Sequence, residues 1–202
     1  MKSRLYWFVG GDAGAWRVRT IDCIAGKPLA EVARLAVVSG LSTEPPGATW
    51  LLRGITSNER YVEHAEKDRL VARQAGLGRP EAVCAALIPI RKNAAWWSLS
   101  QDERREIFEE QSRHIQIGLD YLPAVARRLH HCRDLGENEP FDFLTWFEYA
   151  PGDEPGFNEL VAHLRASPEW AYVDREIDIR LLRSGGDNAA ELADARDDRA
   201  GS

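Results

Sequence analysis

The order in which strand-like and helix-like segments follow one another most constrains what this chain can fold into. In the first half, apolar runs typical of strands are separated by segments with helical spacing. These patterns predict strands over 5–9, 16–23 and 50–55 and helices over 27–38 and 59–75. Because Gly- and Pro-rich turns separate the segments, we expect an α+β unit with its helices on one face of a sheet.

The second half repeats these element types with stronger signals. Ser100 and Glu103 form an S-x-x-E capping box, which predicts that one long helix begins there and covers 100–119. The remaining segments are predicted as strands over 82–90, 125–132, 141–149 and 172–182 and a helix over 155–166. In the last strand, apolar and charged residues alternate, so we expect one face on the core and one face in solvent.

Two similar α+β units in tandem therefore account for the pattern, at residues 1–95 and 96–183, although the halves share no sequence repeat. The tail at 184–202 carries five acidic and two basic side chains and is expected to be disordered. The whole chain has a formal net charge of −6 and no basic block. This charge distribution argues against a nucleic-acid partner.

Cysteine usage and apolar run lengths bear on the compartment. Cys23, Cys84 and Cys132 are odd in number and lack C-x-x-C spacing, which argues against a disulfide framework. No apolar run reaches membrane-spanning length, and the apolar part of the N-terminus is too short for a secretory signal. We expect a cytoplasmic protein that does not enter a membrane.

His114 is the first candidate for chemistry. The buried stripe of the helix over 100–119 is marked, at helical spacing, by Ile107, Phe108, Gln111, Ile115 and Gly118. His114 lies beside this stripe and is expected to point inward. From the pattern alone a hydrogen-bonded core histidine is the commoner outcome, but a neutral imidazole is also a common proximal ligand of haem iron.

Arg127 is the second candidate, on the strand over 125–132. Alternation places Arg127, Leu129 and His131 on one face and Arg128, His130 and Cys132 on the other. An inward arginine keeps its charge and needs an anionic partner, so a structural ion pair and an anion-binding role both remain open. Because adjacent side chains point to opposite faces, His130, His131 and Cys132 cannot share one metal ion.

Three other residues stand close to the capping box. Trp96 and Trp97 fit simple packing, but seven tryptophans in 202 residues also suit the lining of a large flat ligand. Lys92 follows an apolar segment and fits either a solvated surface lysine or a cation that pairs with a propionate.

Taken together, these segments resemble the chlorite dismutase family, in particular its short, dimeric bacterial branch. The resemblance runs from about Gly54 to Leu182, whereas the first fifty residues match weakly. It rests on ALIPIRK (86–92), WWSLS (96–100), ERREIF (103–108), SRH (112–114), YLP (121–123) with the stretch to Arg127, FDFLTWFE (141–148) and YVDREIDI (172–179). Asp120 is a departure from the pattern, since helical spacing predicts an apolar residue there.

The resemblance implies a fold and a cofactor. The fold is a dimeric α+β barrel made of two tandem ferredoxin-like halves, with haem b in the C-terminal half and a homodimer as the assembly. His114 falls on the iron ligand and is the implied metal-binding residue. Arg127 falls on the distal catalytic arginine, which the related coproheme decarboxylases lack.

Further roles follow residue by residue from the same resemblance. Gln74 falls on the glutamine that holds the distal arginine at the channel, and Lys92 on the propionate-side cation. Trp96, Trp97 and Leu122 are expected to contact the cofactor. The glutamate that hydrogen-bonds the ligand imidazole falls on Glu169, with Glu159 as the alternative.

The implied reaction converts chlorite to chloride and dioxygen, with Arg127 attracting the small anion and retaining hypochlorite in an apolar pocket. Three alternatives remain open at this point. The first is another haem enzyme on the same fold, a coproheme decarboxylase or a weak peroxidase. The second is a barrel that binds or senses haem without catalysis, and the third is a small-ligand domain without iron.

Overall fold

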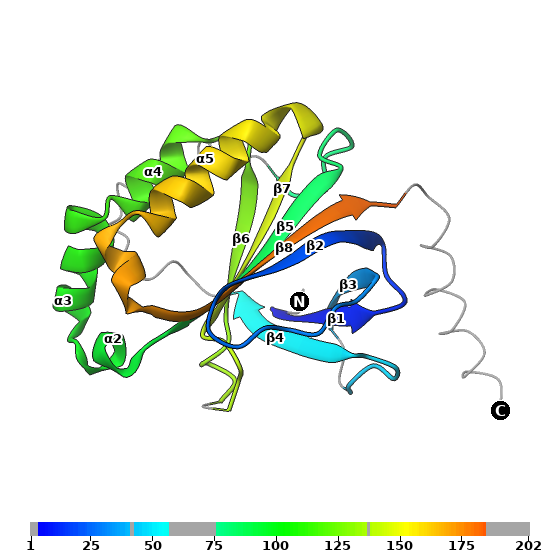
Figure 1. The fold of residues 1–202 in the computed structure, drawn as a ribbon, viewed down its shortest axis with the longest axis horizontal. Helices are drawn as coiled ribbons and strands as arrows, with labels where there is room; N and C mark the ends of the chain where they lie inside the picture. The colour runs from blue at the N-terminus through cyan, green and yellow to red at the C-terminus, as the bar shows by residue number, and fades with distance from the viewer. Residues whose placement is uncertain (1–3, 41–42, 57–75, 137, 185–202) are drawn as a thin grey trace.

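The eight strands that the structure describes close into one antiparallel barrel, in the order β1-β3-β2-β8-β5-β7-β6-β4 (Figure 1). The computed structural model describes residues 4–40, 43–56, 76–136 and 138–184. The strands are β1 (Leu5–Gly11), β2 (Trp16–Ala25), β3 (Arg34–Ser39), β4 (Trp50–Thr56), β5 (Cys84–Lys92), β6 (Ala126–His131), β7 (Phe143–Tyr149) and β8 (Val173–Arg183). This architecture confirms the expected α+β barrel.

The strand order divides into two groups of four, and β5, which the expected boundary at 95/96 assigned to the first unit, lies among the strands of the second. Strands β4, β1, β3 and β2 follow one another in the N-terminal half, and β8, β5, β7 and β6 follow one another in the C-terminal half. Counted from the first strand of its own half, each half therefore has the order 4-1-3-2, which is the ferredoxin-like order. Two junctions join the halves: β2 pairs with β8, and β4 pairs with β6 through Ile55–His131 and Thr56–His130.

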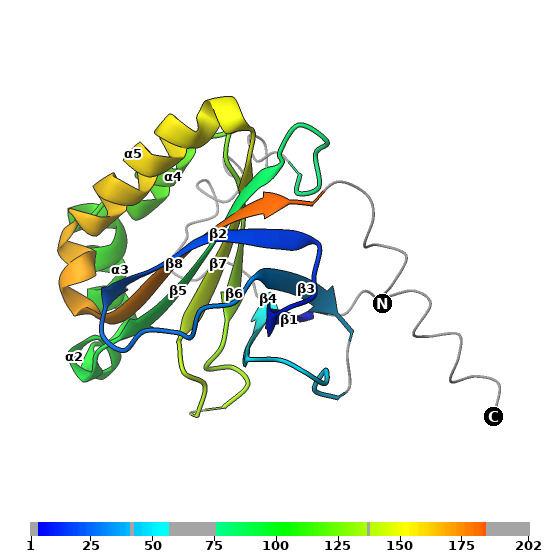
Figure 2. The same ribbon diagram turned by 45° about the vertical axis from the view of Figure 1, so that its right-hand side comes forward.

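Within the described residues, the helices belong to the C-terminal half. They are α2 (Ala94–Ser98), α3 (Gln101–Arg105), α4 (His114–Asp120) and α5 (Glu154–Arg165), with 3-10 turns at Pro151–Asp153 and Pro168–Tyr172. Figures 1 and 2 show these helices on the outer side of the β5–β8 sheet, away from β1, β3 and β4. The boundary expected at 95/96 falls inside α2, while the helix expected over 59–75 lies outside the described residues.

The helix predicted over 27–38 is wrong. Residues 26–33 contain no helix, and Arg34–Ser39 forms strand β3 between β1 and β2. Short apolar runs fit helical and strand periods alike, and the β-branched pair Val37–Val38 favours a strand. The decisive interaction is long-range, because β3 pairs with β1 over six residues, from Tyr6–Ser39 to Gly11–Arg34.

The capping box is confirmed, but the single long helix is wrong. Ser100 accepts a hydrogen bond from the Glu103 amide, and the Glu103 side chain accepts one from the Ser100 amide. After α3 the chain forms a π-helix over Glu106–Gln111, and Arg113 is left-handed with φ of 52°. The Glu109 carboxylate then accepts a hydrogen bond from the Ile115 amide at 2.6 Å, so α4 begins anew at His114.

The C-terminal sheet carries one apolar core on each face. Inside the barrel, Phe8, Leu87, Leu144 and Ile179 are buried together with their neighbours. On the outer face, the other side chains of β5 and β7 pack against the apolar side of α5. The four residues predicted to form that side of α5 are all buried: Phe157, Leu160, Val161 and Leu164.

The expectation of a solvated face on the last strand is wrong for Glu176 and Asp178. Their carboxylates are buried, and Arg165 of α5 bonds both, at 2.6 Å and 3.0 Å. Arg180 also pairs with Asp178. The charged side of β8 is therefore covered by α5 and neutralised by arginine, because a buried charge requires a partner.

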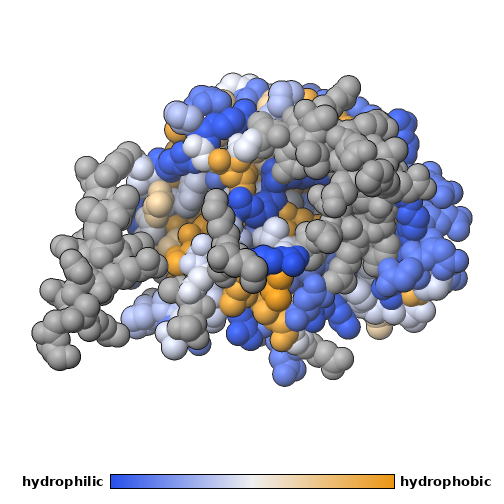
Figure 3. Space-filling model, turned by 180° about the vertical axis from the view of Figure 1, so that it is seen from behind, coloured by the Kyte–Doolittle hydropathy of each residue, from blue (hydrophilic) through white to orange (hydrophobic). Residues whose placement is uncertain are grey.

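The surface of the molecule mixes apolar and hydrophilic side chains. Figure 3 shows apolar side chains gathered toward the middle of the face opposite to that in Figure 1, among hydrophilic ones.

Cys84 and Cys132 are buried, Cys23 is exposed, and none of the three forms a disulfide. Among the described residues, no helix is long and apolar enough to cross a membrane.

Candidate functional site

The imidazole of His114 is held by a buried carboxylate. The Nδ1 atom of His114 lies 2.7 Å from Oε2 of Glu169, which follows α5 in the 3-10 turn Pro168–Tyr172. An ionised carboxylate only accepts hydrogen bonds, so Nδ1 is the donor here, and in the neutral imidazole Nε2 is the nitrogen with the lone pair. Within the described part of the chain, no hydrogen-bond partner contacts Nε2. The ring also stacks on Phe108, at 4.3 Å between centroids.

Glu169 is in turn paired with Lys92. The Nζ atom of Lys92 lies 2.7 Å from Oε1 of Glu169, and both side chains are at most 5% exposed. The same ammonium lies 4.5 Å from the ring centroid of Trp96 and 5.5 Å from that of Trp170. His114, Glu169 and Lys92 thus form one buried chain of charge-assisted contacts.

The neighbouring charges decide the protonation state of Glu169. Burial by itself would raise the pKa of Glu169, but the neighbouring His114 and Lys92 outweigh burial and lower that pKa to about 2. Burial lowers the pKa of Lys92, and Glu169 opposes that change. Near neutral pH the carboxylate is therefore ionised and available to accept the His114 proton.

Arg127 reaches the helix that carries His114. Its side chain leaves β6 on the outer face of the sheet, and a methyl group at Gly118 would lie 3.1 Å from its Nη1 atom and 3.3 Å from Cζ. Gly118 is four residues after His114 in α4, so both lie on one face of that helix. The structure therefore brings the imidazole and the guanidinium to one face of α4, where the guanidinium lies against the backbone of Gly118.

Apolar side chains flank this surface. Ile115 and Leu119 are buried, and Phe108 and Leu122 pack against them. These residues offer no acid or base beside His114 and Arg127. An apolar surround strengthens the attraction between a fixed guanidinium and a small anion.

Trp96 and Trp97 lie at the Lys92 end of the site and have different surroundings. Trp96 is 1% exposed and packs on Tyr172 at 5.5 Å between centroids. Trp97 is partly exposed and donates a hydrogen bond from Nε1 to Asp142 at 3.2 Å. Its ring lies against the guanidinium groups of Arg133 and Arg104, at 4.1 Å and 5.1 Å from the centroid.

These residues fit a haem iron ligated by His114. A proximal histidine needs one ring nitrogen anchored and the other available to the metal, as in His114. Gly118, one turn along the helix, adds no side chain of its own between α4 and the Arg127 guanidinium, as a flat macrocycle held there would require. Neither feature would be required of a histidine that only packs in a core.

Three further residues were expected at or near the site: Gln74, Glu159 and Lys92. Gln74 lies outside the described residues. Glu159 is exposed on α5, so the contact with His114 is made by Glu169 instead. Lys92, expected on the propionate side, has its ammonium bound to Glu169.

Sequence reasoning missed two polar residues that position this site. The Ser112 hydroxyl accepts a hydrogen bond from the Glu169 amide at 2.9 Å, which ties the turn of Glu169 to the start of α4. The Asp142 carboxylate accepts from the Lys92 amide at 2.7 Å as well as from Trp97. Burial raises the pKa of Asp142. No local pattern distinguishes either residue from an ordinary surface serine or aspartate.

Known proteins share both the sequence and the fold of this chain. The chlorite dismutase family model matches residues 44–183. A chlorite dismutase from Ideonella dechloratans is 36% identical over 88 residues, which cover 44% of this chain and 28% of that relative's length. The aligned segment therefore spans less than a third of that protein.

Solved structures extend the similarity over more of the chain. A dimeric chlorite dismutase from Nitrobacter winogradskyi is 55% identical with a TM-score of 0.83, covering 89% of this chain and 99% of that one. Chlorite dismutase from Candidatus Nitrospira defluvii, in complex with imidazole, is 20% identical with a TM-score of 0.60, covering 91% and 93%. The last comparison supports the fold alone.

Proposed function

Because this chain belongs to the chlorite dismutase family, we propose that it is a haem b enzyme that converts chlorite to chloride and dioxygen. The observation that carries the proposal is the shared face of α4, where an anchored imidazole lies one turn from a guanidinium that packs against Gly118. Haem b, when bound, supplies the iron redox chemistry, and the protein supplies charge, orientation and access.

On the proximal side, His114 would hold the iron through Nε2, while Glu169 accepts the hydrogen bond from Nδ1. A carboxylate that accepts this proton makes the imidazole a more basic ligand and stops the ring from turning. Lys92 keeps Glu169 ionised inside the fold, which accounts for a buried lysine at this position. The face of the Trp96 ring packs against the Lys92 ammonium of this ion pair.

On the distal side, Arg127 binds the substrate anion. A guanidinium keeps its charge at every pH at which the protein is folded, so it attracts chlorite without supplying a proton. Leu122 and its apolar neighbours exclude water and offer no acid–base group. The same guanidinium would hold the hypochlorite anion close to the cofactor, and the family resemblance assigns to Gln74, outside the described residues, the role of positioning this arginine.

The assembly and compartment are proposed on separate grounds. The similar chain from Nitrobacter winogradskyi is a dimeric chlorite dismutase, and its 99% coverage supports a homodimer here. Apolar side chains near the middle of the face in Figure 3 offer surface that such an interface buries. A reducing, cytoplasmic location fits three cysteines without a disulfide.

An absorption spectrum and an oxygen electrode together test the proposal. The protein with haemin is expected to show a ferric haem spectrum and to release one dioxygen for each chlorite consumed. Loss of coproporphyrin carboxyl groups without oxygen release would instead indicate a coproheme decarboxylase. Peroxide turnover alone would indicate a peroxidase, haem uptake without turnover a haem sensor, and no uptake of haemin a domain without iron.

A further inference from the structure

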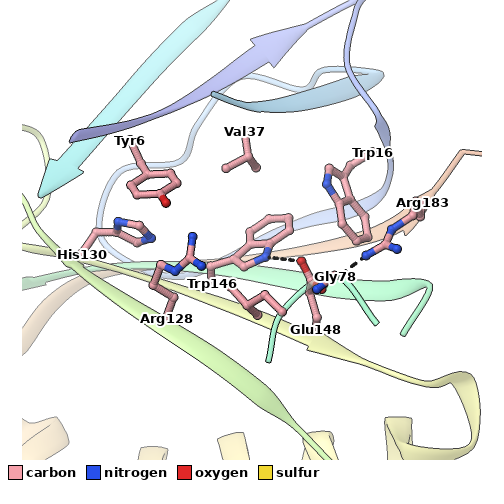
Figure 4. Close-up of a pocket in the computed structure, with 10 residues that line it drawn as sticks. Tyr6, Trp16, Val37, Gly78, Arg128, His130, Trp146, Glu148 and Arg183 are labelled. Carbon is pink, nitrogen blue, oxygen red and sulfur yellow. Dashed lines mark hydrogen bonds and ion pairs between the residues drawn. The ribbon is translucent and has the colours of Figure 1, made fainter. Parts of the chain in front are cut away.

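A cavity lies inside the barrel, on the opposite face of β6 from Arg127. It has a volume of about 380 Å³ and lies between strands of the two halves (Figure 4). Tyr6 of β1, Trp16 of β2 and Val37 of β3 line it on one side, and Arg128, His130 and Trp146 of β6 and β7 line it on the other. None of these residues belongs to the site around His114.

The cavity contains the positive charge of Arg128. Figure 4 shows its guanidinium rising from β6 into the space between Tyr6 and Trp146. The guanidinium lies over the Tyr6 ring, 5.0 Å from the centroid. Among the residues that the structure describes, no Asp or Glu pairs with Arg128.

The other charged groups of the cavity are already matched to one another. The Glu148 carboxylate accepts hydrogen bonds from the Gly78 amide at 2.6 Å, from Trp146 Nε1 at 3.0 Å and from Arg183 at 3.3 Å. Burial, followed by the nearby charge of Arg128, lowers the pKa of His130 to about 3. His130 is therefore neutral near pH 7, and the described residues that line the cavity sum to a charge of about +1.

The walls indicate the kind of anion that fits. Trp16 and Trp146 meet edge to face, 5.1 Å between centroids, and Tyr6 and Val37 add apolar surface. Cavities of about 300–1,000 Å³ take small organic ligands, whereas an inorganic oxyanion would leave most of 380 Å³ unfilled. Aromatic walls bind flat rings, and a guanidinium pairs with a carboxylate through two parallel hydrogen bonds.

We propose that the barrel interior is a binding site for a small aromatic carboxylate, with its carboxylate on Arg128 and its ring against Tyr6 and Trp146. Arg127 and Arg128 then serve two anion sites on opposite faces of one strand. The proposal does not depend on haem, because none of its residues contacts the His114 site.

Isothermal titration of the full chain with sodium benzoate tests the site. We expect one saturable site per chain, and at least tenfold weaker binding of benzamide, which has the ring without the charge, and of acetate, which has the charge without the ring. Arg128→Gln should weaken benzoate binding at least tenfold. Arg127→Gln is the matched control, since it removes the same group from the other face of β6 and should leave benzoate binding unchanged.

Two further measurements make the test independent of whether Arg128→Gln folds. Val37→Phe fills the cavity without changing its charge and should abolish benzoate binding while circular dichroism shows a folded protein. Haemin added before the titration should not alter the benzoate affinity. The proposal is overturned if benzoate binding does not saturate, or if folded Arg128→Gln or Val37→Phe binds benzoate with unchanged affinity. Loss of benzoate binding in Arg127→Gln or after addition of haemin would overturn it as well.

Discussion

The Nδ1 atom of His114 lies 2.7 Å from a carboxylate oxygen of Glu169, although 55 residues separate the two along the chain. Glu169 is held in turn by Lys92 at 2.7 Å and by the Ser112 hydroxyl through its amide. The imidazole is thus oriented by a buried carboxylate that Lys92 of β5 and Ser112, just before α4, hold in place. Substitutions at each contact of this arrangement, and at the facing Arg127, should have distinct effects.

Replacing the ligand should remove haem binding. His114→Ala takes away the only atom proposed to ligate the iron, so the variant should fail to develop the spectrum of histidine-ligated ferric haem during haemin titration. His163→Ala is the matched control, because His163 lies on α5 and contacts Tyr121 instead. A spectrum of histidine-ligated haem in the His114→Ala variant would contradict the assignment.

Removing the charge of Glu169 should change the ligand without removing it. Glu169→Gln should lower haem affinity or activity by about 10- to 100-fold, the usual effect of losing a group that orients a metal ligand. The ferric–ferrous reduction potential should rise because a less basic imidazole stabilises ferric iron less. Spectroelectrochemistry measures this potential.

Two variants separate that electronic effect from stability. Glu159→Gln changes an exposed glutamate of α5 and should leave the potential unaltered. The double variant Lys92→Met/Glu169→Gln removes the buried lysine charge that the single variant leaves unpaired, and it should regain stability while keeping the raised potential. An unshifted potential in both Glu169 variants would show that Glu169 has no influence on the iron.

Acid should destabilise the fold through Glu169. Its pKa is lowered in the folded state to about 2 from an ordinary 4.5, so its stabilising effect is full above pH 4.5 and is lost as pH falls toward 2. Relative to the Lys92→Met/Glu169→Gln variant, the wild-type protein should lose about 2 kcal/mol of unfolding free energy between pH 6 and pH 3. Urea denaturation at each pH measures the unfolding free energy of both proteins. If this free energy varied with pH in the same way in the two proteins, the result would count against the ion pair.

Removing the distal charge should separate haem binding from catalysis. Arg127→Ala should keep its haem spectrum, release less oxygen per chlorite and leak hypochlorite, because no cation retains the anion near the iron. A hypochlorite-trapping dye and haem bleaching report the leak. Arg19→Ala is a suitable control, since Arg19 is an exposed residue of β2 paired with Glu154. An oxygen yield equal to that of the wild type would remove Arg127 from the mechanism.

Filling the surface of α4 should block the site. Gly118→Val places a branched side chain one turn from His114, where a single carbon already meets Arg127 at 3.1 Å. We expect weaker haemin binding with little change in the melting temperature of the haem-free protein. Gly152→Val is the control, because a side chain there would meet nothing within 4 Å. Equal haemin affinity in the two variants would show that Gly118 does not face the cofactor.

The sequence by itself determined the elements whose signals are local. The capping box at Ser100 and Glu103 begins a helix as predicted, and the apolar spacing of α5 buries its four predicted residues. Alternation along β6 is sufficient to assign Arg127 and Arg128 to opposite faces, since neighbouring side chains of a strand diverge. These features depend on contacts within a few residues, which the order of amino acids states directly.

Only the tertiary structure decided which distant groups meet. Residues 34–39 became a strand because β1 lies alongside them, and the helix after Gln111 restarted at His114, where Glu109 bonds the Ile115 amide. Glu169 rather than Glu159 meets His114 because the chain after α5 turns back against the segment Glu106–Ser112, where the Ser112 hydroxyl binds the Glu169 amide. Periodicity carries no information about such pairings, because their free energy arises only once the barrel has brought separate segments within hydrogen-bonding distance.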